Sequence, residues 1–147
     1  MLSWLFSDPL TVGGQAPDFT AQDQDGNQVR LSTLKGQNVV LVFYPMDETP
    51  GCTTQLCEFR DHWPDMKDKN TLVFGVNPGS AEKHQKFIRS RSFPFPLIVD
   101  EGKKIANLYN AGGPIIKRTV YLIGKDGTIR FAQRGKPMPS DVLKSAQ

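Results

Sequence analysis

Apolar residues along this chain form two kinds of pattern, continuous runs and positions at helical spacing. Residues 38–44 (NVVLVFY) and 71–76 (TLVFGV) are continuous β-branched and aromatic runs. Such runs are typical of strands buried on both faces of a sheet. Residues 96–100 and 119–123 are shorter runs of the same kind, and we expect strands there as well.

Helical spacing begins directly after residue 53. Leu56, Phe59 and Trp63 lie three and four residues apart. This spacing predicts a helix that opens at Gly51–Cys52 and lasts at least to Trp63. Pro64 then either kinks the helix or begins a new turn. Further helices are expected over residues 81–90, with Ser80 as the N-cap, over residues 103–109 and over residues 141–145.

Two short turn signatures predict β-hairpins. Asp25-Gly26-Asn27 and Gly124-Lys125-Asp126-Gly127 contain the residues that favour tight turns between strands. The strands that they join are residues 18–21 with 28–31, and residues 119–123 with 128–132.

The order of these elements predicts the fold class. Strands that alternate with helices, followed by an antiparallel pair, indicate an α/β fold with a mixed central β-sheet flanked by helices and an N-terminal β-hairpin. The linkers are short throughout, so residues 1–147 are predicted to form a single domain. Residues 1–13 precede the pattern and are interpreted as an N-terminal extension.

The charge distribution argues against nucleic-acid binding. The chain of 147 residues has a net charge of +3. Residues 1–100 carry 9 basic and 12 acidic side chains, and residues 101–147 carry 9 and 3. The chain has no basic run of five or more residues, and its aromatic residues do not alternate with basic ones. We therefore expect no nucleic-acid partner and read the charges as solvated surface.

Neither a membrane span nor an export signal is expected. No apolar run approaches the roughly 20 residues that cross a bilayer. The first six residues, MLSWLF, are apolar but lack a basic start, and Asp8 and Pro9 follow closely. These features predict a cytoplasmic protein in a reducing compartment, where two retained cysteines are more often redox-active, catalytic or metal-binding than a structural disulfide.

The two cysteines, Cys52 and Cys57, are five residues apart on one predicted helix. Cys52 follows a buried strand and a Thr-Pro-Gly turn, at a helix N-terminus that favours a thiolate. In an intact helix, five residues separate the Cα atoms by about 8.6 Å. A disulfide spans at most roughly 7 Å between Cα atoms. The two sulfurs can therefore bond only if the helix start unwinds.

Other interpretations of the cysteines remain open. Cys57 is also interpretable as a small buried residue and Cys52 as an incidental surface thiol. A zinc site would need His62 and His84 as further ligands, but the spacing is not one that structural zinc uses. The Cys-x-x-Cys motif of thioredoxin-type dithiol oxidoreductases is absent.

Residues 43–61, FYPMDETPGCTTQLCEFRD, resemble the active-site segment of the peroxiredoxins, specifically the peroxiredoxin Q group, also called bacterioferritin comigratory protein. Pro45, Thr49 and Cys52 meet the family's P-x-x-x-T-x-x-C pattern, and Cys52 and Cys57 meet the C-x4-C pattern of the group. The likeness extends from about residue 14 to residue 135. Met46 departs from it, since a lysine is common there, and the C-terminal segment is short and interrupted by prolines.

The resemblance implies a thioredoxin-like fold and the reduction of hydrogen peroxide and organic hydroperoxides without a cofactor or metal. It implies that Cys52 is the peroxidatic thiol and that Cys57 resolves its sulfenic acid as an intramolecular disulfide, which thioredoxin reduces. Thr49 would hold the peroxide, Pro45 would shield the pocket, and Arg118 would face the thiolate. We expect a monomer or a weak homodimer and no membrane partner.

Each of these assignments has a plain structural alternative. Thr49 is also a turn residue, Pro45 a strand terminator, and Arg118 a possible surface partner of an acidic side chain. Arg60, on the same helix as Cys52, competes for the role of nearby cation. At the level of function, the alternative is a peroxide-responsive redox sensor or adaptor that uses the same disulfide switch.

Overall fold

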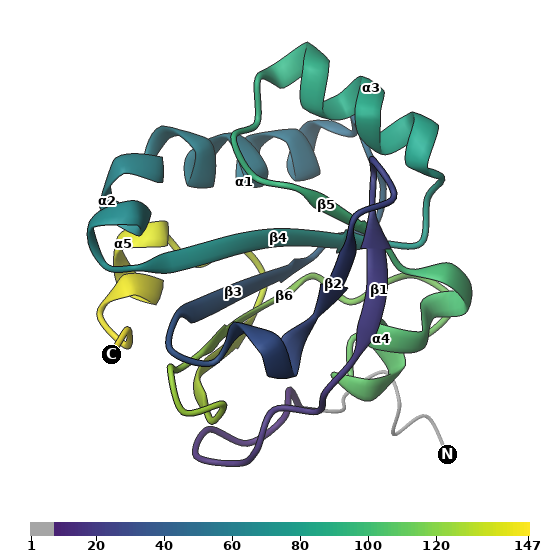
Figure 1. Cartoon of the computed structure of the whole chain (residues 1–147). Coiled ribbons are helices and arrows are strands. Elements are labelled where there is room, and N and C mark those ends of the chain that lie inside the picture. The colour runs from purple at the N-terminus through teal and green to yellow at the C-terminus, as the bar shows by residue number, and fades with distance from the viewer. Residues whose placement is uncertain (1–7) are drawn as a thin grey trace.

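The computed structural model of the protein describes residues 8–147 and contains one seven-stranded mixed sheet. The strands run in the order β2-β1-β5-β4-β3-β6-β7 (Figure 1). The β3–β4 and β4–β5 pairs are parallel and the other pairs are antiparallel. The strands are β1 (Thr20–Asp23), β2 (Gln28–Arg30), β3 (Asn38–Phe43), β4 (Thr71–Asn77), β5 (Leu97–Val99), β6 (Thr119–Ile123) and β7 (Ile129–Arg134).

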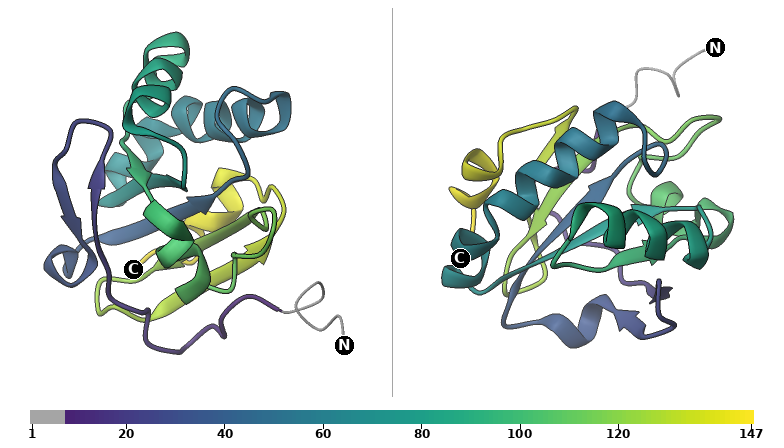
Figure 2. Two further views of the ribbon diagram at one scale, coloured as in Figure 1. Left: turned by 90° about the vertical axis from the view of Figure 1, so that its right-hand side faces the viewer. Right: turned by 90° about the horizontal axis from the view of Figure 1, so that it is seen from above.

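Helices cover both faces of this sheet (Figures 1 and 2). Leu56, Phe59, Phe87 and Val142 of helices α1, α3 and α5 pack in the core of one face. On the other face, α4 packs together with the N-terminal segment and the 3₁₀ helix η2. The helical elements are η2 (Leu31–Leu34), α1 (Pro50–Asp61), α2 (Trp63–Asp68), α3 (Ala81–Arg91), η3 (Glu101–Lys103), α4 (Lys104–Leu108) and α5 (Pro139–Leu143).

The continuous apolar runs occupy the centre of the sheet. Every residue of β3 is buried, and so is every residue of β6, because layers of helix and loop cover both faces there. Asn38 begins β3, and its side-chain amide donates to the backbone oxygens of Lys69 and Gln147, 3.1 and 2.9 Å away. This arrangement confirms the predicted α/β class with a mixed sheet and an N-terminal hairpin.

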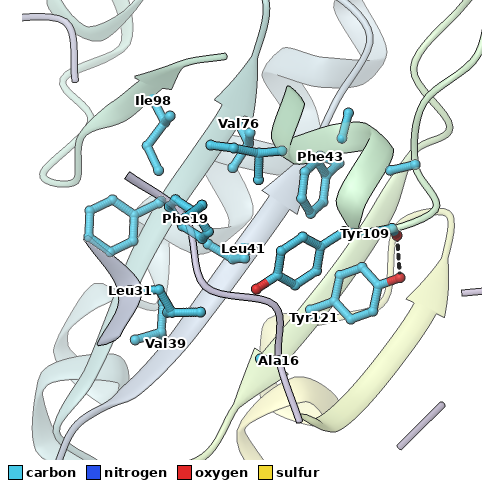
Figure 3. Close-up of a cluster of buried hydrophobic side chains, with 14 of the residues drawn as sticks. Ala16, Phe19, Leu31, Val39, Leu41, Phe43, Val76, Ile98, Tyr109 and Tyr121 are labelled. Carbon is cyan, nitrogen blue, oxygen red and sulfur yellow. Dashed lines mark hydrogen bonds between the residues drawn. The ribbon is translucent and has the colours of Figure 1, made fainter. Parts of the chain in front are cut away.

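A cluster of aromatic rings fills the core beneath α4 (Figure 3). Tyr109 packs edge-on against Tyr121, with ring centroids 5.3 Å apart, and its backbone oxygen accepts a 2.6 Å hydrogen bond from the Tyr121 hydroxyl. The Tyr109 hydroxyl donates to the backbone oxygen of Pro17. Burial raises the pKa of both phenols above the ordinary value, so both stay protonated as donors. They hold the N-terminal segment against the sheet.

Several predicted boundaries differ from the structure by one or two residues, and three of the differences have clear causes or positions. The helix expected to reach at least Trp63 ends at Asp61, and α2 begins at Trp63. Pro64 causes the break because it has no N–H for the helix and its ring clashes with the preceding turn. The final helix begins at Pro139 instead of residue 141, since proline is favoured in a first turn. The first strand begins at Thr20 instead of residue 18.

The predicted N-terminal extension is described in part. Residues 1–7 lie outside the described residues. In the rest of it, Leu10 donates its backbone N–H to the Tyr121 hydroxyl at 2.9 Å, and Gly13 donates to the backbone oxygen of Ile129 at 2.7 Å. Residues 8–13 are thus bonded to β6 and β7. Among residues 8–147, no helix combines the length and the apolar character that crossing a bilayer would require.

Candidate active site

Cys52 lies in the first turn of α1, which follows the fully buried strand β3 after a loop of residues 44–49. Thr49 is the N-cap residue with an extended backbone, Pro50 occupies the first turn, and Thr53 donates its N–H to the Thr49 oxygen at 2.8 Å. The N–H groups of Gly51 and Cys52 precede this first helical hydrogen bond, so they have no partner within the helix. Cys52 is only 1% exposed. The local sequence therefore places a buried thiol at the positive end of a helix.

Arg118 reaches this thiol from the residue before β6. Its Nη2 donates to the Cys52 Sγ at 3.2 Å. A guanidinium is a delocalised cation whose planar fork presents several donors, and one of them here contacts the sulfur directly. The structure thus brings together two predicted residues that are 66 positions apart in the chain.

Gln55 fixes the orientation of that guanidinium. Arg118 Nη1 donates to Gln55 Oε1 at 2.8 Å, and Gln55 Nε2 donates to the Gly135 oxygen at 3.2 Å. Gln55 is buried and lies three residues after Cys52, on the same face of α1. The prediction omitted Gln55, although its spacing from Cys52 was a signal that could have found it.

Lys136 adds a second cation beside the start of α1. A Cβ placed on Gly51 would lie 3.3 Å from Arg118 Nη2 and 3.5 Å from Lys136 Nζ, so the absent side chain leaves room for both groups. Gly135 donates its N–H to the Arg118 oxygen at 2.8 Å, which holds the loop after β7 in place. No local pattern pointed to Lys136, because β7 brings it to the site from the far end of the sequence.

Thr49 and Pro45 lie on the loop that leads into α1. The Thr49 hydroxyl donates to the Met46 oxygen at 2.9 Å, which leaves its lone pairs available to accept a hydrogen bond. Pro45 is half-buried, and its backbone oxygen accepts from Asn77 Nδ2 at 2.9 Å. Met46, on the same loop, is 63% exposed.

Both cysteines of α1 are free thiols; Cys57 is half-buried and Cys52 is buried.

Arg60, the alternative cation that the sequence offered, makes its hydrogen bonds away from Cys52. Its Nη1 donates to the Arg91 oxygen at 2.6 Å and its Nε pairs with Asp61 at 3.0 Å. The suggestion that Arg60 is the cation beside Cys52 is therefore wrong, because its guanidinium is bonded to the C-terminal end of α3.

The two histidines have hydrogen-bond partners of their own. His62 Nδ1 lies 2.9 Å from the Glu58 oxygen, and His84 Nδ1 lies 2.6 Å from Asp47 Oδ2. Over residues 8–147, no group of three or more histidine, cysteine or acidic side chains has the arrangement of a metal site.

Most of the sequence matches a known family model. A model described as the AhpC/TSA family covers residues 12–132. The protein named Peroxiredoxin Bcp of Bacillus subtilis (strain 168) is 39% identical over 147 residues, which cover 94% of this chain and 94% of that relative. The chain belongs to the AhpC/TSA family, in its peroxiredoxin Q/Bcp group.

Further relatives of the group agree with this membership. Peroxiredoxin Q, chloroplastic, of Oryza sativa subsp. japonica is 38% identical over 134 residues, and the match covers 88% of this chain and 62% of the rice protein's length. The crystal structure of peroxidoxin BcpB from Mycobacterium tuberculosis has a TM-score of 0.85 at 28% identity, covering 92% of this chain and 96% of that chain. This likeness to a solved peroxiredoxin confirms the thioredoxin-like fold.

Proposed function

We propose that this peroxiredoxin is a thiol peroxidase that reduces hydrogen peroxide and organic hydroperoxides through Cys52. The observation that carries the proposal is the buried Cys52 Sγ with the Arg118 guanidinium 3.2 Å away at a helix N-terminus. Thiolate is the nucleophilic form of cysteine, and this surrounding of positive charge favours it. Pro45 and the rest of the loop shield the sulfur from bulk water.

In the first step, the Cys52 thiolate attacks one oxygen of the peroxide. An S–O bond forms, the O–O bond breaks, and the departing oxygen takes a proton to leave as water or an alcohol. Arg118 and the N–H groups of Gly51 and Cys52 stabilise the negative charge that grows on that oxygen. The Thr49 hydroxyl accepts from the peroxide O–H, since its own proton is donated to Met46. The product is Cys52 sulfenic acid.

In the second step, Cys57 attacks the sulfenic sulfur, a disulfide forms and water leaves. The sulfenic acid is neutral, so the charge-assisted hydrogen bond from Arg118 to the sulfur weakens and the start of α1 is released. The unwound segment then allows the two sulfurs to meet. A dithiol protein of the thioredoxin type restores both thiols by exchange and is itself oxidised to a disulfide.

The decisive experiment mixes reduced protein with hydrogen peroxide in a stopped-flow instrument and identifies the product by peptide mass spectrometry. We expect a disulfide between Cys52 and Cys57 and sustained turnover with thioredoxin and its reductase. Cys52→Ser abolishes peroxide consumption, whereas Thr54→Ser, a matched change on the same helix, retains it. Full activity of Cys52→Ser would refute the assignment. Rapid oxidation without any recycling would instead favour the redox-sensor function.

A further inference from the structure

A buried chain of hydrogen bonds lies behind the active-site loop and takes no part in the peroxide chemistry. The Tyr44 hydroxyl donates to Asp47 Oδ1 at 2.6 Å, and Asp47 Oδ2 lies 2.6 Å from His84 Nδ1. The side chains of His84 and Asp47 are 0% and 7% exposed. Burial and the Asp47 carboxylate raise the pKa of Tyr44, so its phenol remains a donor.

The partners of His84 determine where its protons lie. Nε2 is 3.1 Å from the backbone oxygens of both Asn77 and Ile98. Carbonyl oxygens accept only, so Nε2 carries a hydrogen. The 2.6 Å contact between Nδ1 and Asp47 Oδ2 is a hydrogen bond that joins the two side chains directly. Every polar atom of the Asp47–His84 pair thus has a partner, as a buried pair requires.

Asn77 ties the same stretch of backbone to β4. Its Nδ2 donates to the oxygens of Tyr44 and Pro45 at 2.8 and 2.9 Å, and its Oδ1 accepts from Gly79 N at 2.7 Å. The Tyr44 ring is held as well, because a Cβ on Gly75 would lie 3.1 Å from its Cε1. Residues 44–47 are therefore bonded through side chains and backbone to β4 and α3.

The residues that follow are held by fewer and more exposed bonds: Ser90 Oγ of α3 donates to Glu48 Oε1 at 3.3 Å, and the Thr49 hydroxyl donates to the Met46 oxygen at 2.9 Å. Glu48 has φ = 61°, a left-handed conformation that costs free energy in a residue with a side chain. Thr49 makes no side-chain cap to α1. Thr53 Oγ1 is buried and has no hydrogen-bond partner among the described residues, which is a cost that unwinding would remove. The boundary between a fixed and a strained segment falls between Asp47 and Glu48.

We propose that Tyr44, Asp47 and His84 are positioning residues that form the fixed end of a hinge at Glu48. They hold the chain up to Asp47 in place and confine the unwinding needed for disulfide formation to residues 48–57. This inference rests on the proposed function, since it concerns the two steps of that reaction. α1 and α3 lie on the same face of the sheet (Figure 2), so α3 supplies the support through His84.

Loss of this support changes the two steps in opposite directions. With Asp47 released, the loop no longer holds Cys52 at one position relative to Arg118, and attack on peroxide slows, because small displacements in a reacting geometry are costly. The start of α1 unwinds more easily, so the disulfide forms faster. A sulfenic acid that is resolved quickly also spends less time exposed to a second peroxide.

The test compares Asp47→Ala with Asp100→Ala. Asp100 is also a buried carboxylate, and it accepts from the N–H groups of Ile105 and Ala106 at 2.8 and 3.0 Å on the opposite face of the sheet. We expect Asp47→Ala to lower the rate of Cys52 oxidation roughly tenfold, to raise the rate of disulfide formation and to reduce overoxidation. Equal slowing of both steps, as general destabilisation in Asp100→Ala would produce, would overturn the proposal.

Asp47→Asn serves as the conservative variant. Its Oδ1 accepts from Tyr44 and its Nδ2 donates to His84 Nδ1, so a neutral His84 keeps Nε2–H for the carbonyl oxygens. We expect both rates to return to within about twofold of wild type. If Asp47→Asn behaves as Asp47→Ala does, the hydrogen-bonded hinge is wrong. Should Asp47→Ala not fold, Tyr44→Phe with Tyr109→Phe as its control makes the same test by deleting one buried hydroxyl from each face.

Hydrogen–deuterium exchange of the reduced protein tests the hinge without peroxide. In the wild type, residues 48–57 should exchange faster than residues 43–47. In Asp47→Ala, exchange should spread into residues 43–47, and in Asp100→Ala it should not. If exchange at residues 43–47 is unchanged in Asp47→Ala, the hinge proposal is refuted. Wild-type protein that ignores peroxide would instead refute the proposed function and leave this result standing.

Discussion

Cys52 and Cys57 lie on the same continuous helix, α1, with both sulfurs free. A regular helix separates Cα atoms five residues apart by about 8.6 Å, and a disulfide spans at most roughly 7 Å. The conformation with Arg118 at the Cys52 sulfur is therefore one that cannot form the disulfide. Reaction with peroxide and resolution by Cys57 need two conformations of the same segment.

Replacement of Cys57 separates the two steps. In Cys57→Ser, Cys52 keeps its contacts and should be oxidised at the wild-type rate. Without a resolving thiol, the protein should consume about one peroxide per chain and then stall, with excess peroxide carrying Cys52 to sulfinic acid. Stopped-flow oxidation and intact mass spectrometry measure both results. Sustained turnover of this variant without an added small thiol would contradict the role of Cys57.

Removal of the Arg118 guanidinium should slow the first step. Arg118→Ala deletes the donor 3.2 Å from Cys52 Sγ, and we expect the rate of oxidation to fall about 100-fold, as for loss of one donor to a developing charge. Arg118→Lys retains a positive charge without the planar guanidinium, so its oxidation rate should lie between those of wild type and Arg118→Ala. Arg60→Ala is the control, since Arg60 is bound to Arg91 and Asp61. Equal rates in Arg118→Ala and Arg60→Ala would remove Arg118 from the reaction.

Gln55 should affect the rate through Arg118. Gln55→Ala frees the guanidinium to move, and we expect a roughly tenfold slower oxidation of Cys52. Gln55→Glu should be slower still, because the introduced carboxylate competes with the Cys52 thiolate for the Arg118 cation. Thr54→Ala is the control on the same helix, since the Thr54 hydroxyl bonds within α1 to the Pro50 oxygen. A faster Gln55→Glu than Gln55→Ala would contradict this account.

The stability of the fold should depend on Asp18 at neutral pH. The backbone hydrogen bond from Ser32 is the main cause that lowers the pKa of this carboxyl, and Phe19 donates to it as well. A lowered pKa in the folded state stabilises the protein above the unfolded pKa, and this contribution is lost as the pH falls through the folded one. Wild type should therefore be more stable than Asp18→Asn at pH 7. The difference should begin to shrink as the pH falls below the unfolded pKa of about 4 and should vanish only below the lowered folded pKa.

Urea unfolding at several pH values measures this difference. Asp25→Asn is a suitable control, because the Asp25 carboxylate accepts from the Gln24 side chain on the exposed turn. A pH-independent gap between wild type and Asp18→Asn would show that Asp18 acts through packing or shape instead of charge.

Local patterns predicted the strands and helices well, and the errors have local causes. The run at residues 38–44 contains the fully buried β3, which ends one residue earlier at Phe43, and Ser80 caps α3 by accepting from Lys83 N at 3.2 Å. The end of α1 was misplaced, since the spacing of apolar residues continues to Trp63 while Pro64 forbids one continuous helix. Hydrophobic periodicity reports which face is buried and does not mark the last residue of a helix.

By itself, the sequence determined the α/β class, the thiol at a helix start and the family pattern around Cys52, because turns, caps and periodicity act between residues close in the chain. The family resemblance also named Arg118 as the residue that faces the thiolate. Only the tertiary structure brought Lys136 to Gly51, excluded Arg60 and joined Asp47 to His84. Those contacts depend on strand order and on how α3 packs on the sheet. A spacing in sequence carries no information about which distant side chains a sheet brings together.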